Sequence, residues 1–211
     1  LASLPCETIL HRGHGWGALE NMRRRAENKP LLPASFTFPQ DTLGKEQEPW
    51  ICLLEGRALP ELNDTHFPAS WMTDANYIPY LERCIKSDPH NTAAQLHLGV
   101  NLYENGRYDE AAALWEKALL AKPLPILHRN LACAAHQEGE LKKAIRQMEQ
   151  ITLDTYIAAD AAFLQEYLRL LAEDGQWQKL NDIYQKLPAR LKEEEHDGHS
   201  AISRCQSGQH T

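Results

Sequence analysis

A pattern of apolar, small and glycine residues that returns after 33 residues constrains the fold of this chain more than any other feature. The matched positions are Leu98, Gly99, Gly106, Ala111 and Trp115 in the first copy and Leu131, Ala132, Gly139, Ala144 and Met148 in the second. A looser third copy follows at a spacing of 36 residues and contains Gly175, Trp177, Leu180 and Tyr184. Recurrence at a period of a few tens of residues is typical of solenoid proteins, in which similar units stack on one another.

The residue types within each copy predict a pair of helices. Gly106 and Gly139 would end the first helix of a pair, because glycine adopts the left-handed conformation at little steric cost. Small residues at Gly99 and Ala111 would let the helices approach closely, and Trp115 would fill the space between neighbouring pairs. Residues 77–89 have the pattern of the second helix of a further, degenerate unit. The alternative is a helical bundle whose periodicity arose by chance.

These residues resemble the tetratricopeptide repeat family, and the resemblance covers residues 76–188. It implies an all-α fold in which about three helix pairs stack into a superhelix. In this family the first helices of the pairs line a concave groove. The resemblance therefore implies a surface that binds a peptide or a neighbouring domain.

The helical register predicts which side chains face that groove. They are Leu96, Val100, Tyr103, Glu104, Arg129, Cys133, His136, Gln137, Gln165 and Arg169, and Glu173 is a further candidate in the third copy. Some members of the family use Lys and Asn residues in the groove to clamp the carboxylate tail of a chaperone. The corresponding positions here carry Leu96, Val100, Arg129 and Cys133, so we do not expect a chaperone tail as the ligand.

The first 70 residues contain seven of the twelve prolines. Each proline removes a backbone donor and collides with the preceding helical turn, so we expect irregular structure with short elements. Those elements are a helix at Ala18–Glu27, a strand or helical turn at Trp50–Leu54 and a strand at Glu7–His11. The predicted division of the chain is an N-terminal connector at 1–72, helical repeats at 73–188 and a polar tail at 189–211.

A second resemblance involves Gly15–Glu20 (GWGALE), Gln47–Trp50 and residues 68–89. These stretches resemble the C-terminal repeat region of large bacterial proteins in which a mutarotase-like, sugar-associated β-sandwich domain of unknown function precedes the repeats. The resemblance covers residues 7–187 and implies that the chain is the end of a larger carbohydrate-related protein. The first residue is Leu rather than Met, which fits this expectation.

Composition and charge argue against several classes of function. The formal net charge of −7 argues against attraction to nucleic acid phosphates. We find no apolar stretch long enough to span a bilayer and no signal-peptide pattern at the start. The five cysteines are widely spaced and odd in number, which suits reduced thiols in the cytoplasm better than a disulfide framework.

Two histidine clusters are candidate metal sites. His11 and His14 lie among glycines, and a tight turn explains that stretch as well as a metal site or a sugar-stacking Trp16 does. His196, His199, Cys205 and His210 are good zinc ligand types, but their surroundings are polar and predict a frayed tail. We therefore predict no metal and no cofactor.

The sequence thus favours a non-catalytic scaffold that binds a protein, a peptide or another domain of the same polypeptide. Self-association is a further expectation, since an incomplete last pair would expose an apolar face. The runner-up is a fragment of a carbohydrate-active or sugar-binding bacterial protein. A zinc-binding regulatory protein is the third interpretation.

Overall fold

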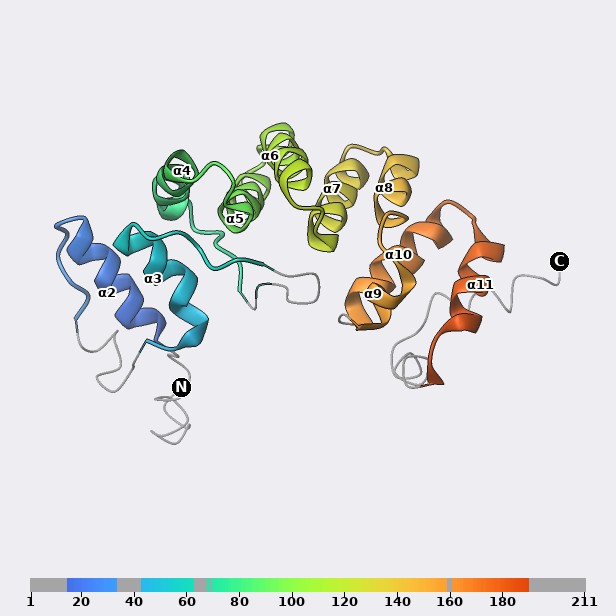
Figure 1. Ribbon diagram of the computed structural model, residues 1–211, viewed down its shortest axis with the longest axis horizontal. Coiled ribbons are helices and arrows are strands. Elements are labelled where there is room, and N and C mark those ends of the chain that lie inside the picture. Colours follow the sequence, from blue (N-terminus) through green and yellow to red (C-terminus); the bar gives the residue numbers. More distant parts are fainter. Residues whose placement is uncertain (1–14, 34–42, 63–67, 69, 159–160, 190–211) are drawn as a thin grey trace. The chain divides into compact units, whose positions relative to one another are not determined.

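This computed structural model describes residues 15–33, 43–62, 68, 70–158 and 161–189 of the 211-residue chain. Within these residues every regular element is a helix (Figure 1). The all-α prediction is therefore confirmed for the described part of the chain. The predicted strand at Glu7–His11 and the C-terminal histidines lie outside the described residues.

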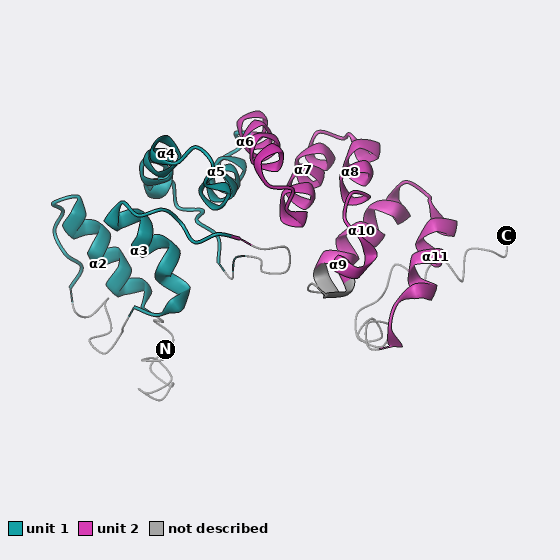
Figure 2. Cartoon of the chain, in the orientation of Figure 1, with its two compact units in different colours: residues 1–61, 68–107 teal, residues 62–67, 108–211 magenta. Residues whose placement is uncertain are grey.

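The chain forms two compact units, which are drawn in different colours in Figure 2. The first comprises residues 1–61 and 68–107, and the second comprises residues 62–67 and 108–211. The division of the chain at residues 72 and 188 stays a prediction. The two units are described one after the other.

The first unit contains four α-helices and two short 3-10 turns among its described residues. Their bounds are α2 Trp16–Ala26, η1 Lys45–Gln47, α3 Glu48–Glu55, η2 Ala75–Tyr77, α4 Ile78–Ser87 and α5 Thr92–Glu104. Consecutive α-helices pack on one another, α2 on α3, α3 on α4 and α4 on α5.

Helices α2 and α3 lie in the segment that the sequence predicted to be irregular. The expected helix at 18–27 is present as α2, and the residues around Trp50 form a helix of eight residues rather than a strand. Two side chains of α4 form hydrogen bonds to these helices. Arg83 Nη2 donates to the Leu53 carbonyl of α3 at 2.9 Å, and the Tyr80 hydroxyl donates to Glu27, the residue after α2, at 3.1 Å. This part of the chain is therefore a helical extension packed against α4.

Buried polar side chains on and before α5 hold the preceding segments in place. Asn101 is fully buried, and its Nδ2 donates to the carbonyls of Met72 at 2.8 Å and Asp74 at 2.9 Å. Asn91 caps α5 by accepting from the Ala94 amide at 2.8 Å, while its own amide group donates to the Leu59 carbonyl at 3.2 Å. A cap of this kind satisfies amides that a helix start leaves without partners.

The second unit contains six helices among its described residues. Their bounds are α6 Tyr108–Ala121, α7 Pro125–Gln137, α8 Leu141–Met148, α9 Leu153–Ala158, α10 Ala161–Glu173 and α11 Trp177–Lys186. Helix α7 packs on α6 and α8, and α10 packs on α8, α9 and α11. The short α9 occupies the insertion that lengthens the spacing of the third copy.

The core of the second unit contains the small and apolar residues that the repeat pattern singled out. Ala132, Ala144 and Met148 are each at most 2% exposed. Tyr156, from α9, stacks on Tyr167 with ring centroids 5.4 Å apart and donates its hydroxyl to the Met148 carbonyl at 2.8 Å. The insertion therefore adds aromatic mass to the core instead of looping away from it.

Candidate functional site

One face of α7 carries three of the predicted groove residues. Arg129, Cys133 and His136 are spaced four and three residues apart, so an α-helix places them on the same side. All three are half-buried. Their neighbours on the opposite side, Leu131 and Ala135, are buried in the core.

Helix α10 presents a matching face to α7. The Arg129 guanidinium donates two hydrogen bonds to the Glu166 carboxylate, from Nε to Oε2 at 2.7 Å and from Nη2 to Oε1 at 2.5 Å. Two turns further along, His136 Nε2 lies 2.9 Å from the nearer carboxylate oxygen of Glu173. Both pairs join residues that are 37 apart in the sequence. The two helices therefore meet in the same register along this face.

Between these two pairs lies a cavity of about 160 Å³. Its lining residues are Arg129, Ala132, Cys133, His136, Met148, Glu166, Arg169 and Leu170. Its floor is apolar and its rim carries both charge signs. A cavity of this size is below the range of 300–1,000 Å³ or so that is typical of small-molecule pockets; it suits a single side chain.

The Cys133 thiol lies in this cavity next to ionisable groups. Burial raises its pKa above the usual range for a thiol, and the nearby Arg129 guanidinium offsets only part of that increase. The group is therefore a protonated thiol at neutral pH. A thiol in that state is a poor nucleophile and a poor metal ligand.

Of the other predicted residues on α7 and α10, Arg169 lines this cavity, whereas Gln137 and Gln165 do not. Both glutamines are exposed at the edges of the cavity. Glu166 and Leu170 line it but were missed by the sequence analysis. Gln165 was predicted in their place, one residue out of register on α10.

The four predicted residues on α5 belong to the other compact unit. Val100 and Tyr103 are half-buried and Glu104 is exposed. Leu96 is fully buried, so its assignment to a ligand-binding surface is wrong. The physical reason is that the segment around Met72 packs over α5, and Asn101 of α5 donates a hydrogen bond to the Met72 carbonyl. Most residues of α5 are therefore buried.

Comparison with known protein families identifies one segment. Residues 73–132 match the tetratricopeptide repeat family. This segment is a tetratricopeptide repeat region. The matched segment contains α4, α5, α6 and the first eight residues of α7. No curated protein matches the chain in the comparison made.

Tetratricopeptide repeats are typically protein-interaction modules, and the α7–α10 face belongs to the first helices of two successive repeat units. Helix α7 begins the second copy of the sequence pattern and α10 begins the third. The matched segment ends at Ala132, which itself lines the cavity. The candidate site thus starts inside the matched segment and continues into the third, more divergent copy.

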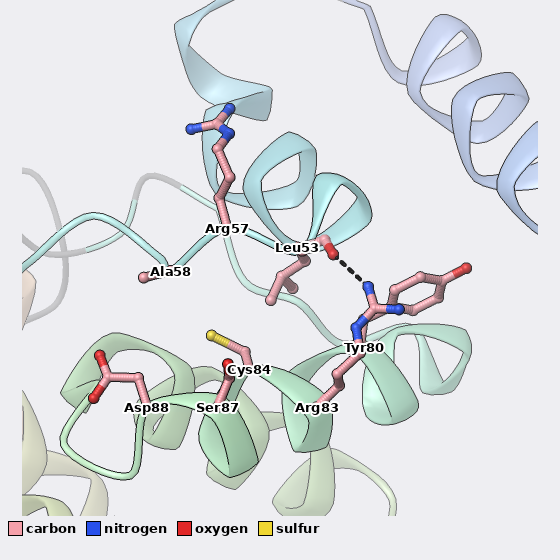
Figure 3. Close-up of a pocket in the computed structure, with 9 residues that line it drawn as sticks. Leu53, Arg57, Ala58, Tyr80, Arg83, Cys84, Ser87 and Asp88 are labelled. Atoms are coloured by element: carbon pink, nitrogen blue, oxygen red, sulfur yellow. Dashed lines mark hydrogen bonds between the residues drawn. The ribbon is translucent and has the colours of Figure 1, made fainter.

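A second cavity, of about 350 Å³, lies between the N-terminal extension and the first repeat helix α4 (Figure 3). Arg83 stretches across its end to the Leu53 carbonyl and lies over the Tyr80 ring at 5.2 Å. The Arg57 side chain extends away from Arg83 in this view and pairs with Glu48 and Glu55. The two guanidinium groups therefore do not converge on a common ligand position.

No group of three or more His, Cys, Asp or Glu side chains in the part of the chain that the structure describes is arranged to hold a metal ion. None of the helices described is both long enough and apolar enough to cross a membrane. The histidine clusters at His11 and His14 and at His196, His199 and His210 lie outside the described residues.

Proposed function

We propose that this chain is a non-catalytic docking module that holds an extended peptide, or a loop of a neighbouring domain, on the face formed by α7 and α10. The observation that supports this proposal is the cavity between Arg129, Cys133, His136 and Arg169. It has room for one side chain, and its rim carries hydrogen-bonding groups for the backbone on either side.

The chemistry of this face suits a peptide of mixed character. Ala132, Met148 and Leu170 offer apolar contact to a small or branched side chain at the bottom of the cavity. The Arg129–Glu166 and His136–Glu173 pairs flank it with charges of both signs. Arg169 is exposed at the rim, where a guanidinium can donate to a carboxylate or a backbone carbonyl of the ligand.

The state of the ionisable groups supports a binding role over a catalytic one. The Cys133 thiol is protonated, and the nearest imidazole, His136, is engaged by Glu173. An activated nucleophile needs a base within hydrogen-bond reach that is itself oriented by a third group. A buried thiol with a raised pKa is a poor starting point for that chemistry. The same proposal places the protein in the cytoplasm, where reduced cysteines persist.

The test is selection of binding peptides from a phage-displayed random peptide library on the immobilised full chain. Selected peptides are then measured against Arg169→Glu and against Lys186→Glu, which makes the same charge change on exposed α11. We expect Arg169→Glu to weaken binding by about tenfold or more, since it removes a charge-assisted hydrogen bond and adds a repulsive charge. Lys186→Glu should leave binding unchanged.

Two results would count against the proposal. One is a library that yields no peptide with saturable binding. The other is a set of peptides that lose affinity equally with both variants, which would mean that net charge rather than the α7–α10 face determines binding.

A further inference from the structure

A third cavity, of about 300 Å³, lies in the first compact unit and is separate from the proposed docking face. It is bounded by α2, α3 and the segment of residues 70–77. Its volume is at the lower end of the range of small-ligand pockets. Three of the five tryptophans of the chain line it, Trp16, Trp50 and Trp71.

The tryptophans form a rigid aromatic wall. The rings of Trp16 and Trp50 meet edge to face, with centroids 4.9 Å apart and an angle of 86° between their planes. Trp50 is 5% exposed and supports the wall from behind, whereas Trp16 is 36% exposed and Trp71 is half-buried. Trp16 and Trp71 are therefore the rings with indole surface available to a ligand.

The buried His97 side chain fixes the other side of this wall. Its ring centroid lies 5.7 Å from that of Trp71 and 6.3 Å from that of Trp50. It is 2% exposed, and its Nδ1 has no hydrogen-bond partner among the described residues. Burial lowers its pKa to about 4, so the ring is neutral at physiological pH and places no positive charge behind the tryptophans.

Polar groups complete the rim of the cavity. The Asp74 carboxylate accepts from the Asn76 backbone amide through Oδ1 at 2.9 Å, and no hydrogen bond among the described residues engages its Oδ2. Ser70 and Thr73 also line the cavity, and the hydroxyl group of each can both donate and accept. Together they offer hydrogen bonds of both kinds beside an aromatic surface.

The charges around the cavity are close to balanced. Its charged lining residues are Glu20 and Asp74. Glu20 accepts hydrogen bonds from Arg23 at 2.8 Å and from Arg24 at 2.6 Å. Arg23 also pairs with Glu27, which Lys29 contacts at 2.6 Å, so the cationic groups Arg23, Arg24 and Lys29 balance the anionic groups Glu20, Glu27 and Asp74. A cation therefore gains little from the local field, and an anion meets the exposed Asp74 side chain. A neutral ligand with several hydroxyl groups matches the site better than an ion of either sign.

We propose that this cavity binds one ring of a neutral saccharide. The C–H-rich face of the sugar would lie against Trp16 and Trp71, and its hydroxyl groups would pair with Asp74, Ser70 and Thr73. Indole rings provide broad apolar contact at low entropic cost, and ligand hydroxyl groups need partners of both donor and acceptor type. This site is independent of the peptide face on α7 and α10.

The test is NMR titration of the full chain, labelled with ¹⁵N at the tryptophan indoles, against a panel of D-glucose, D-galactose, D-mannose, D-xylose and N-acetyl-D-glucosamine. We expect at least one sugar to shift the indole signals of Trp16 and Trp71 in a saturable manner. The signals of Trp115 and Trp177, which lie in the other unit, should not move. Tetramethylammonium serves as the cation probe.

Variants then separate the cavity from the rest of the surface. Trp16→Ala should weaken binding of that sugar by about tenfold, the effect of losing one aromatic contact. Trp177→Ala removes an indole that is 47% exposed and lies outside the cavity, and it should have no effect. Thr73→Val keeps the side-chain shape, removes the hydroxyl group and should weaken binding severalfold, which provides a second variant if Trp16→Ala does not fold.

Three results would overturn the proposal. The first is a panel in which no sugar shifts the Trp16 and Trp71 indole signals. The second is a response to tetramethylammonium but not to sugars, which would make the cavity a cation site. The third is an equal loss of affinity with Trp16→Ala and Trp177→Ala.

Discussion

Arg129 of α7 and Glu166 of α10 form a bidentate pair between the first helices of two successive repeat units. The two hydrogen bonds measure 2.7 and 2.5 Å, and each side chain is 30% exposed. The pair shares its 37-residue separation with His136 and Glu173. These two contacts set the register of α7 against α10 and thereby shape the cavity between them.

A double-mutant cycle on Arg129→Ala and Glu166→Ala should give a coupling free energy of about 1 kcal/mol, measured by urea unfolding. Bidentate geometry places the value at the upper end for a partly exposed ion pair. The matched control is Lys143 and Glu140, which lie 2.8 Å apart on the surface near the start of α8 with about half of each side chain exposed. That cycle should give about 0.3 kcal/mol. Equal coupling free energies in the two cycles would show that the Arg129–Glu166 pair is no stronger than an ordinary surface ion pair.

Asn101→Ala should destabilise the protein by about 2 kcal/mol in urea unfolding. The substitution removes the Nδ2 group that donates to both the Met72 and the Asp74 carbonyls. The hydrogen bond to the Met72 carbonyl is buried. Asn76→Ala is the control, because its side-chain amide is exposed and bonds to Asp74 at 2.8 Å; the expected change is within about 0.5 kcal/mol. A small effect of Asn101→Ala would mean that the segment before α4 is not held by this residue.

Gly106→Ala and Gly139→Ala should each cost about 1 kcal/mol of stability. Both residues have a φ of 78°, and a Cβ atom added at either would meet nothing within 4 Å. The cost is therefore conformational rather than steric, and Asn at the same positions should cost less because it tolerates the left-handed region. Gly44→Ala, at a φ of −110°, provides the control and should change stability by no more than about 0.5 kcal/mol. Thermal unfolding followed by circular dichroism measures all of these changes.

His97 should make the protein less stable as the pH falls from about 6.5 to about 4. Its pKa is about 4 in the folded state, because it is buried, and near 6.5 when unfolded. In that interval the unfolded chain binds the proton and the folded chain does not, so the free energy of unfolding decreases by up to about 3 kcal/mol. Below pH 4 this contribution stops changing.

His97→Phe removes the titrating group and keeps an aromatic ring between Trp50 and Trp71. The difference in unfolding free energy between pH 7 and pH 4 should shrink by about the same 3 kcal/mol or so. His90→Asn, at an exposed position, should leave the pH dependence as it is in the wild type. An unchanged pH dependence in His97→Phe would contradict the assignment.

The repeat itself was predictable because its signals are local. Gly106, Gly139 and Gly175 all adopt positive φ at the predicted helix ends. Ala111, Trp115, Ala144 and Met148 are buried as the spacing indicated. Turn chemistry and helical period act over a few residues, so they can be read without knowing the rest of the fold.

The candidate site was predictable only in part. The register of α7 placed Arg129, Cys133 and His136 on one face, and all three line the cavity. On α10 the predicted Arg169 lines it too, but Gln165 was selected in place of Glu166. Each residue of an α-helix turns by about 100°, so an error of one position changes which side chain faces α7. The insertion that forms α9 displaces the third copy and removes the spacing from which the register was inferred.

The prolines of residues 1–72 predicted irregular structure, because proline interrupts helices. The helical content of this segment was therefore underestimated. Pro49 stands in the first turn of α3, and Pro79 in the first turn of α4. At such positions the missing amide costs nothing, since helix starts leave those amides without intrahelical partners. The resemblance to the region that follows a mutarotase-like domain stays a prediction.

The sequence by itself determined the helical class, the repeat period, the glycine-terminated helix ends and the small residues at close contacts. Each of these depends on interactions between residues near one another in the chain. The tertiary structure decided that α2 and α3 pack as an extension of the repeats, that Leu96 is covered and that Glu166 meets Arg129. It also gathered Trp16, Trp50 and Trp71 into one cavity. Such contacts join residues tens of positions apart, and their free energy depends on how whole helices pack, which local patterns do not encode.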